Sequence, residues 1–221
     1  MSLIDGFGLA SGILWTLTYL CVIRQGLRDH TYAMPFLAMA INIVWEFVFT
    51  FVYPSVGGVM QESINGVWLA LDVAIVAVYL RYWRSDYPQK LPEVYFWPMI
   101  ALTLALIAPV MIATVSVFGR DDGSVYTAFI DNLVMSVLFL SMLVRRGDRR
   151  GQSLWIAWGK LLGTLTASIS QYLYDPGNVL WLVIYIEILV LDIVYVAMLT
   201  RAPRYRRDER YVLVPSAHGS H

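Results

Sequence analysis

The chain has 221 residues, of which 58% are hydrophobic and 14% are charged, and its formal net charge at pH 7 is zero. Its mean hydropathy of +0.61 is far too apolar for a water-soluble domain of this size. The composition therefore excludes an ordinary soluble protein and indicates a protein embedded in a membrane.

A membrane-spanning helix needs about 20 mostly apolar residues, and seven segments of the sequence meet or approach this length. In chain order they are residues 7–23, 34–53, 66–82, 95–118, 125–144, 153–174 and 178–199. The connections between them are too short to hold a separate soluble domain. We therefore predict an all-α integral membrane protein with a seven-transmembrane-helix bundle over residues 1–201, followed by a basic, partly disordered cytoplasmic tail over residues 202–221.

Basic residues follow every second predicted span. They are Arg24, Arg28, Arg81, Arg84, Lys90, Arg145, Arg146, Arg149, Arg150, Arg201, Arg204, Arg206, Arg207 and Arg210. The connections on the other side hold one basic residue, Arg120. By the positive-inside rule the N-terminus is outside and the C-terminus is cytoplasmic. We expect a multi-pass protein of a bacterial or endoplasmic-reticulum membrane, whose arginines set its topology in the lipid bilayer and bind no nucleic acid.

Five carboxylates lie inside the apolar segments: Glu46, Asp72, Asp131, Glu187 and Asp192. A charge at bilayer depth costs at least ~2.5–3.5 kcal/mol on insertion scales, so such residues usually face a bundle interior and carry function. A neutral carboxylic acid in an apolar environment can act as a proton donor. Glu187 and Asp192 point roughly 140° apart on one helix, so we expect one to face the central cavity and the other a neighbouring helix.

Lys160 is the one base that lies well inside a predicted span. It could neutralise a carboxylate, with Asp192 as the best candidate, or it could extend to the membrane interface. The second alternative is slightly favoured. In either case several carboxylates are expected to have no cationic partner.

Amide and aromatic side chains accompany the acids at helical spacing. Asn42 and Glu46 share one face of the second span because they are four residues apart, and Trp45 lies beside them. Aromatic faces stabilise a nearby cation by ~2 kcal/mol when it is desolvated, although many Trp and Tyr residues simply form interfacial belts. The residues predicted to line a cation-stabilising cavity are Asn42, Trp45, Phe49, Trp68, Tyr79, Asn132, Tyr185 and Tyr195.

A buried acid beside aromatic walls suits the protonation of an alkene or epoxide and the guidance of a carbocation through ring closures. The run NIVWE at residues 42–46, Asp72 after Trp68, and the run DIVY at residues 192–195 resemble the membrane-bound terpene cyclases of fungal meroterpenoid and indole-diterpene pathways. Bacterial relatives occur in indole sesquiterpenoid (drimentine-type) pathways. The size, the seven spans and the placement of the acids are similar over nearly the whole chain.

The resemblance implies an enzyme that cyclises a farnesyl or longer prenyl chain on an indole or diketopiperazine, aromatic or polyketide head group. It also implies acid initiation without metal, cofactor or loss of diphosphate. The acids that are essential in the family match Glu46 and Asp192, with Asp72, Asp131 and Glu187 as supporting acids. Because Glu46 and Asp192 differ in predicted depth, they need not share one proton, and Asp72 or Glu187 could be the acid.

The sequence has neither the DDxxD motif that binds diphosphate and magnesium nor the DxDD motif of soluble cyclases. The acidic run at residues 121–125 is expected in an outer loop and lacks the third acid. An alternative function is a small-solute transporter with a 3+1+3 helix arrangement, because LALDV at residues 69–73 is similar to LVLDI at residues 189–193. A retinal-binding receptor is disfavoured, since the last span has no lysine.

Overall fold

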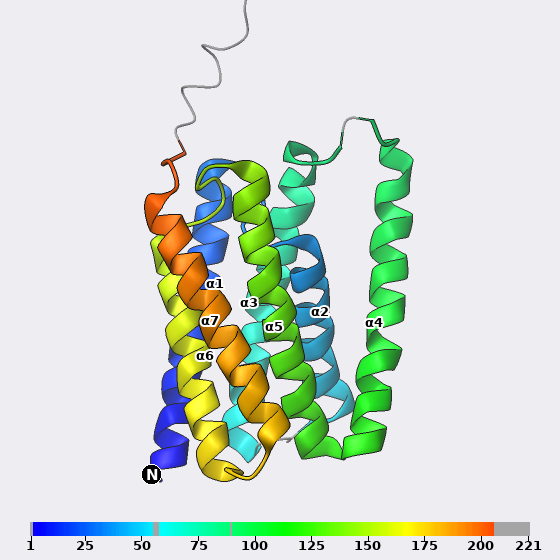
Figure 1. Ribbon diagram of the computed structural model, residues 1–221. Helices are drawn as coiled ribbons and strands as arrows, with labels where there is room; N and C mark the ends of the chain where they lie inside the picture. The colour runs from blue at the N-terminus through cyan, green and yellow to red at the C-terminus, as the bar shows by residue number, and fades with distance from the viewer. Residues whose placement is uncertain (1, 55–57, 89, 206–221) are drawn as a thin grey trace, which may run out of the picture.

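The computed structural model describes residues 2–54, 58–88 and 90–205. In this part of the chain seven α-helices run back and forth through one bundle (Figure 1). They are α1 (Leu3–Asp29), α2 (Phe36–Phe47), α3 (Gly58–Tyr82), α4 (Phe96–Phe118), α5 (Arg120–Arg146), α6 (Leu154–Tyr174) and α7 (Val179–Arg201). No β-strand occurs within the described residues, so the predicted all-α class is confirmed.

Five helices are long and apolar enough to cross a membrane: α1, α3, α4, α5 and α7. The apolar helix at Phe36–Val52 is shorter, and α6 carries Lys160 together with several Gly, Ser and Thr residues. The chain is therefore a multi-pass helical membrane protein. The crossings by α2 and α6, and the orientation of the termini, stay predictions.

Capping residues explain where several helices begin and end. The side chains of Ser2, Ser153 and Asn178 accept hydrogen bonds from backbone N–H groups in the first turns of α1, α6 and α7. Gly147 ends α5 with a left-handed conformation at φ 70°, which glycine adopts without a steric penalty. These capping residues define where the helices begin and end, because the apolar residues inside the helices do not indicate how long each helix is.

The start of α5 differs from the prediction. Residues 121–125 lie in the first turns of this helix and not in a loop, because the break between α4 and α5 is at Gly119, with φ 86°. Asp121 and Asp122 occupy the first turn, where negative side chains interact favourably with the positive end of the helix dipole. The second predicted span also differs, since α2 ends at Phe47 and a π-helix, η1 (Val48–Val52), continues it.

Small residues bring α1 close to α6. A side chain at Gly163 would place its Cβ 2.9 Å from Cδ1 of Trp15, and one at Gly159 would collide with the Thr18 hydroxyl. The hydroxyl of Ser11 donates to the carbonyl oxygen of Gly163 at 2.9 Å. This GxxxG pair on α6 has the spacing by which membrane helices approach at short distance.

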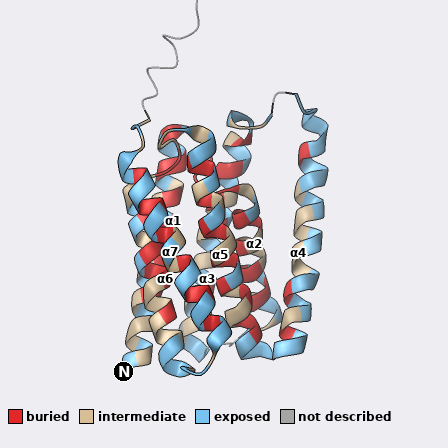
Figure 2. Cartoon of the chain, viewed as in Figure 1, coloured by how far each residue is buried: buried red, intermediate tan, exposed pale blue. Residues whose placement is uncertain are grey.

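Helix α4 lies at the edge of the bundle (Figure 1) and packs mainly against α2 and α5. Its buried residues are Phe96, Met111 and Val115. Figure 2 shows that most of its surface is exposed or intermediate, whereas the facing surfaces of the other helices are buried. The core of the protein is therefore formed mostly without α4.

A polar network closes the end of the bundle where α1, α3, α5 and α7 terminate (Figure 1). Asp86 accepts hydrogen bonds from the guanidinium groups of Arg146 and Arg150, and Arg146 also lies over the ring of Tyr32 at 4.6 Å. Asp29 accepts from the backbone N–H of Gly151 at 2.8 Å. Apart from Arg120 and the buried Lys160, the described basic residues thus gather at this end of the bundle. Residues 206–221, which include Arg206, Arg207 and Arg210, lie outside the described residues.

Candidate active site

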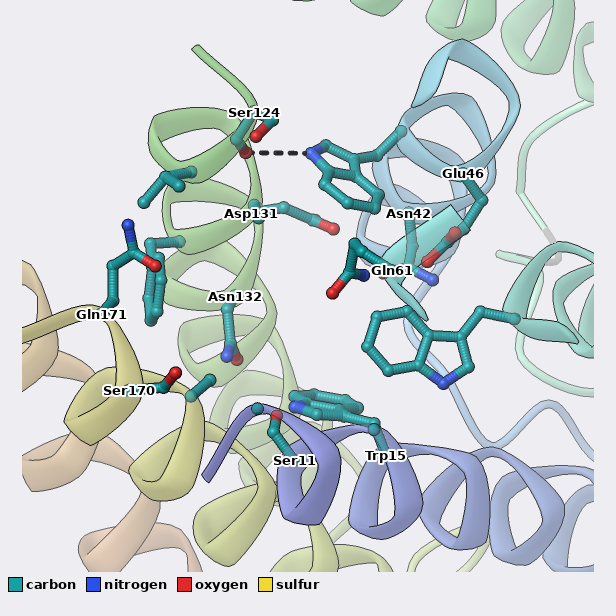
Figure 3. A pocket seen from close by; sticks show the side chains of 18 of the residues that line it. Ser11, Trp15, Asn42, Glu46, Gln61, Ser124, Asp131, Asn132, Ser170 and Gln171 are labelled. Atoms are coloured by element: carbon teal, nitrogen blue, oxygen red, sulfur yellow. Dashed lines mark hydrogen bonds between the residues drawn. The ribbon is translucent and has the colours of Figure 1, made fainter. Parts of the chain in front are cut away.

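A cavity of about 230 Å³ lies between α1, α2, α3, α5 and α6 (Figure 3). Neither α4 nor α7 contributes a described residue to its lining. Beside small and apolar residues such as Ala128 and Met135, the wall contains carboxylic acids, aromatic rings, and a group of amides and hydroxyls. This composition differs from the uniformly apolar filling expected between helices in lipid.

Glu46 and Asp131 line the cavity from α2 and α5, and Figure 3 shows their side chains pointing into it from opposite sides. Asp72 lies next to this space, since the Asn42 amide donates to Asp72 Oδ2 at 2.7 Å. The same amide nitrogen donates to the hydroxyl oxygen of Tyr19 at 2.6 Å. The three acids are only 1% to 4% exposed. Four of the five acids are therefore buried, and three of these lie at or beside the cavity, whereas Asp192 is buried elsewhere.

These three acids lack a cationic partner. No described lysine or arginine forms an ion pair with them, and Glu46 Oε2, Asp72 Oδ1 and Asp131 Oδ1 have no hydrogen-bond partner within the described residues. An isolated ionised carboxylate is strongly disfavoured in an apolar interior. The site can therefore hold a neutral carboxylic acid that donates a proton to a bound molecule.

Five aromatic side chains line the cavity: Trp15, Tyr19, Trp45, Trp68 and Phe129. The indole N–H of Trp45 donates to the Thr127 hydroxyl at 3.0 Å and to the Ser124 carbonyl oxygen at 3.3 Å (Figure 3). The indole N–H of Trp68 donates to the hydroxyl of Thr16 at 3.1 Å. These bonds fix the orientation of two rings, whose faces can stabilise positive charge.

Of the residues predicted to line the cavity, Asn42, Trp45, Trp68 and Asn132 do so. Phe49, Tyr79, Tyr185 and Tyr195 lie elsewhere. Phe49 packs on Trp45 at 4.7 Å, Tyr79 stacks on Phe36 at 5.6 Å, and Tyr185 packs on Phe129 at 4.5 Å. Tyr195 donates its hydroxyl to Gln152 at 2.9 Å. Phe49 and Tyr79 are on helices that line the cavity, but one or two turns of ~5 Å along the axis move a side chain out of a small cavity. Tyr185 and Tyr195 are on α7, which does not contribute to the wall.

Asp192 and Glu187 also lie away from the central cavity, contrary to the expectation that one of them would face it. The Lys160 ammonium donates to both Asp192 oxygens, at 2.8 and 3.0 Å, so the pairing alternative for Lys160 is the one found. Asp192 borders a separate crevice of about 80 Å³ between α6 and α7. Glu187 is exposed on the outer surface of α7, because α7 packs on α5 and α6 with its opposite face.

Several polar residues of the wall were missed from the sequence. Gln61 and Ser124 line the cavity but precede the predicted third and fifth spans, and Gln171 lies in the last turns of α6. A polar residue that interrupts an apolar segment near its end is the signal that could have identified them. No group of His, Cys, Asp and Glu residues suited to a metal ion occurs in the described ranges.

Comparison with known proteins assigns the family. Terpene cyclase macJ of Penicillium terrestre is 26% identical over 178 residues, which are 74% of this chain and 64% of macJ. The Pyr4-family terpene cyclase mfmH of Annulohypoxylon moriforme is 27% identical over 179 residues, 75% of this chain and 68% of mfmH. Terpene cyclase pyr4 of Aspergillus fumigatus is 25% identical over 169 residues, 73% of this chain and 67% of pyr4.

The chain thus spans about two thirds of the length of these relatives. No solved structure matches it. The family model described as Pyr4-like transmembrane terpene cyclases matches residues 1–205, which include every helix of the bundle and the whole wall of the cavity. The chain belongs to the Pyr4-like transmembrane terpene cyclases.

Proposed function

We propose that this protein is a membrane-embedded terpene cyclase that closes rings on a farnesyl-type prenyl chain. The chain would be attached to an indole or diketopiperazine, aromatic or polyketide head group. The observation that carries the proposal is the cavity that brings Glu46 and Asp131 together with five aromatic side chains. Membership of the terpene cyclase family supports it.

Glu46 is the proton donor in this proposal. Its protonated carboxyl group gives a proton to the terminal alkene or epoxide of the prenyl chain, which leaves a carboxylate on Glu46 and a carbocation on the substrate. Internal double bonds then attack the cationic carbon in turn, and the aromatic faces stabilise the charge as it moves. The Glu46 carboxylate takes up the final proton, directly or by transfer through Asp131, so the substrate is isomerised and the protein is restored.

The polar residues of the wall suggest how the substrate lies. Gln61 is in the first turns of α3 and Gln171 in the last turns of α6, and both are at the end of the bundle opposite the network of Asp86, Arg146 and Arg150 (Figure 1). We propose that the head group is held near these amides, while the prenyl chain enters from the bilayer and folds toward Glu46.

The proposed setting is a bacterial or endoplasmic-reticulum membrane crossed seven times. The concentration of arginines and lysine at one end of the bundle supports a cytoplasmic location for that end. The N-terminus and the amide-lined part of the cavity would then face the opposite side. No step of the proposed reaction uses a metal or a cofactor.

The test is product analysis with membranes that contain the protein. They are incubated with a farnesylated indole or diketopiperazine, and separately with the corresponding terminal epoxide. We expect an isomer of unchanged mass from the native protein, and a rate lower by about 100-fold or more with Glu46→Gln, as for the loss of a general acid. Glu93→Gln is the matched control, because Glu93 is in an exposed ion pair with Arg84.

Full activity of a folded Glu46→Gln protein would contradict the assignment of the proton donor. Absence of any cyclised product from the native protein, across several head groups, would contradict the cyclase proposal. In that case uptake of a solute into vesicles would support the transporter alternative instead.

A further inference from the structure

The buried ion pair between Lys160 and Asp192 stands behind the cavity wall. Both side chains are 1% exposed, and neither residue lines the central cavity. Both oxygens of Asp192 accept from the Lys160 ammonium, at 2.8 and 3.0 Å. Asp192 is therefore paired with Lys160 and does not face the cavity in which a molecule beside Glu46 would be bound.

Lys160 is connected to the wall through α5. Its ammonium also donates to the hydroxyl of Ser136 at 2.6 Å, and that hydroxyl donates to the backbone carbonyl of Asn132 at 2.9 Å. The Asn132 side chain in turn donates to the hydroxyl of Thr164 at 2.6 Å, one turn along α6 from Lys160. The segment of α5 that carries Asp131 and Asn132 is thus bound to α6 at two places. One is the Lys160 ammonium, through Ser136, and the other is the Thr164 hydroxyl.

The charges of the pair balance only as long as both members are present. Removal of the Asp192 charge alone would leave an ammonium ion buried without a counter-ion, close to the wall that faces the proposed carbocation. Two like charges repel strongly in a medium of low dielectric constant.

We propose that Lys160 and Asp192 form one neutral positioning unit, in which Asp192 acts on the reaction only as the counter-ion of Lys160. Asp192 is then a positioning residue, whereas Glu46 and Asp131 face the substrate. The kinetic part of this inference rests on the proposed cyclase function. It assigns Asp192 a role different from that of a proton donor.

The experiment is a double-mutant cycle with Asp192→Asn, Lys160→Met and the double variant. The rates are measured in membranes and normalised to folded protein, with kcat and KM determined separately. We expect Asp192→Asn to lower kcat by about 100-fold or more, because it breaks a buried pair and leaves the other charge unpaired. The loss in Lys160→Met is expected to be smaller, since a lone carboxyl group can become neutral by taking up a proton.

The double variant decides the question. If Asp192 acts through Lys160, the double variant recovers at least about tenfold in kcat over Asp192→Asn, because no unpaired charge remains. A double variant as inactive as Asp192→Asn would overturn the proposal, and so would an Asp192→Asn protein with unchanged kcat. A purely structural role would lower the amount of folded protein and leave kcat per folded molecule unchanged, which would also overturn it.

Thermal unfolding in detergent keeps the inference testable if a variant folds poorly or if the native protein cyclises nothing. The unfolding temperature should fall with Asp192→Asn and rise again in the double variant. The exchange of both charges, Lys160→Asp with Asp192→Lys, should likewise be more stable than either single change. Failure of this recovery would overturn the ion-pair unit, whereas absence of products from the native protein would overturn the cyclase proposal alone.

Discussion

Asn42 connects three helices through one side-chain amide. From α2 it donates to Tyr19 on α1 and to Asp72 on α3, at 2.6 and 2.7 Å. All three groups are buried. Because a buried polar group without a partner is unfavourable, this amide stabilises the arrangement of the helices beside Glu46 as well as the orientation of Asp72.

Replacement of Asn42 by leucine, which has the same branched shape and number of side-chain heavy atoms, should remove both hydrogen bonds. We expect the free energy of unfolding to fall by about 1–3 kcal/mol, as when a buried polar group loses its partner. The measurement is thermal unfolding in detergent, with the volume-conserving change Ile41→Leu on the same helix as the control. An Asn42→Leu protein with the stability of the control would show that the amide has no structural role.

At the scale of the element, the close approach of α1 and α6 determines the shape of the cavity. Trp15 lies in its wall and also against Gly163. A methyl group at Gly163 would meet both Cδ1 and Nε1 of the indole, at 2.9 and 3.0 Å, so the ring would have to shift or the helices to separate.

Gly163→Ala should therefore lower cyclase activity and stability together, with a free-energy loss of about 1–3 kcal/mol from overpacking. Gly66→Ala is the matched control, because a Cβ at Gly66 of α3 meets nothing within 4 Å and alanine favours a helix more than glycine does. The readouts are the unfolding temperature and the distribution of cyclised products. Equal behaviour of the two variants would rule out a role of this helix contact in shaping the cavity.

The sequence predicted the helices well and their orientation poorly. The apolar segments define α1 to α7, and the cost of burying a charge was sufficient to place Glu46, Asp72 and Asp131 in the interior. The exposed position of Glu187 and the displacement of Tyr79, Tyr185 and Tyr195 from the cavity could not be predicted. In lipid both the inner and the outer face of a helix are apolar, so hydrophobic periodicity does not reveal which face meets a neighbour.

Two further features could not be predicted from local sequence patterns, and the reason differs between them. The start of α5 at Arg120 depends on the positive φ of Gly119, which a polar run of residues does not indicate. The pairing of Lys160 with Asp192 depends on the packing of α6 against α7, and the alternative of an interfacial lysine has the same sequence pattern.

At the scale of the whole molecule, the polar network around Asp86 joins the loops at the basic end of the bundle. Arg146 has a side chain that is 1% exposed, and its charge is compensated by Asp86, which is 9% exposed. The network links residues that follow α1, α3 and α5. It thereby fixes the helix ends at the side of the bundle away from the amides of the cavity.

Asp86→Ala should destabilise the protein by about 3–5 kcal/mol, since it leaves a buried guanidinium ion unpaired. The same substitution at Glu93 should change stability little, because that carboxylate and Arg84 are both more than half exposed and surface pairs contribute little. Unfolding in detergent compares the two variants directly. Equal unfolding temperatures would mean that the network does not hold the bundle together.

The cavity wall is built from α1, α2, α3, α5 and α6 and leaves α4 and α7 outside it. Substitutions that alter the cavity are therefore expected in these five helices, whereas the exposed surfaces of α4 and α7 can adapt to the thickness of the host bilayer. Evolution toward a new product and adaptation to a new membrane would thus act on separate parts of the chain.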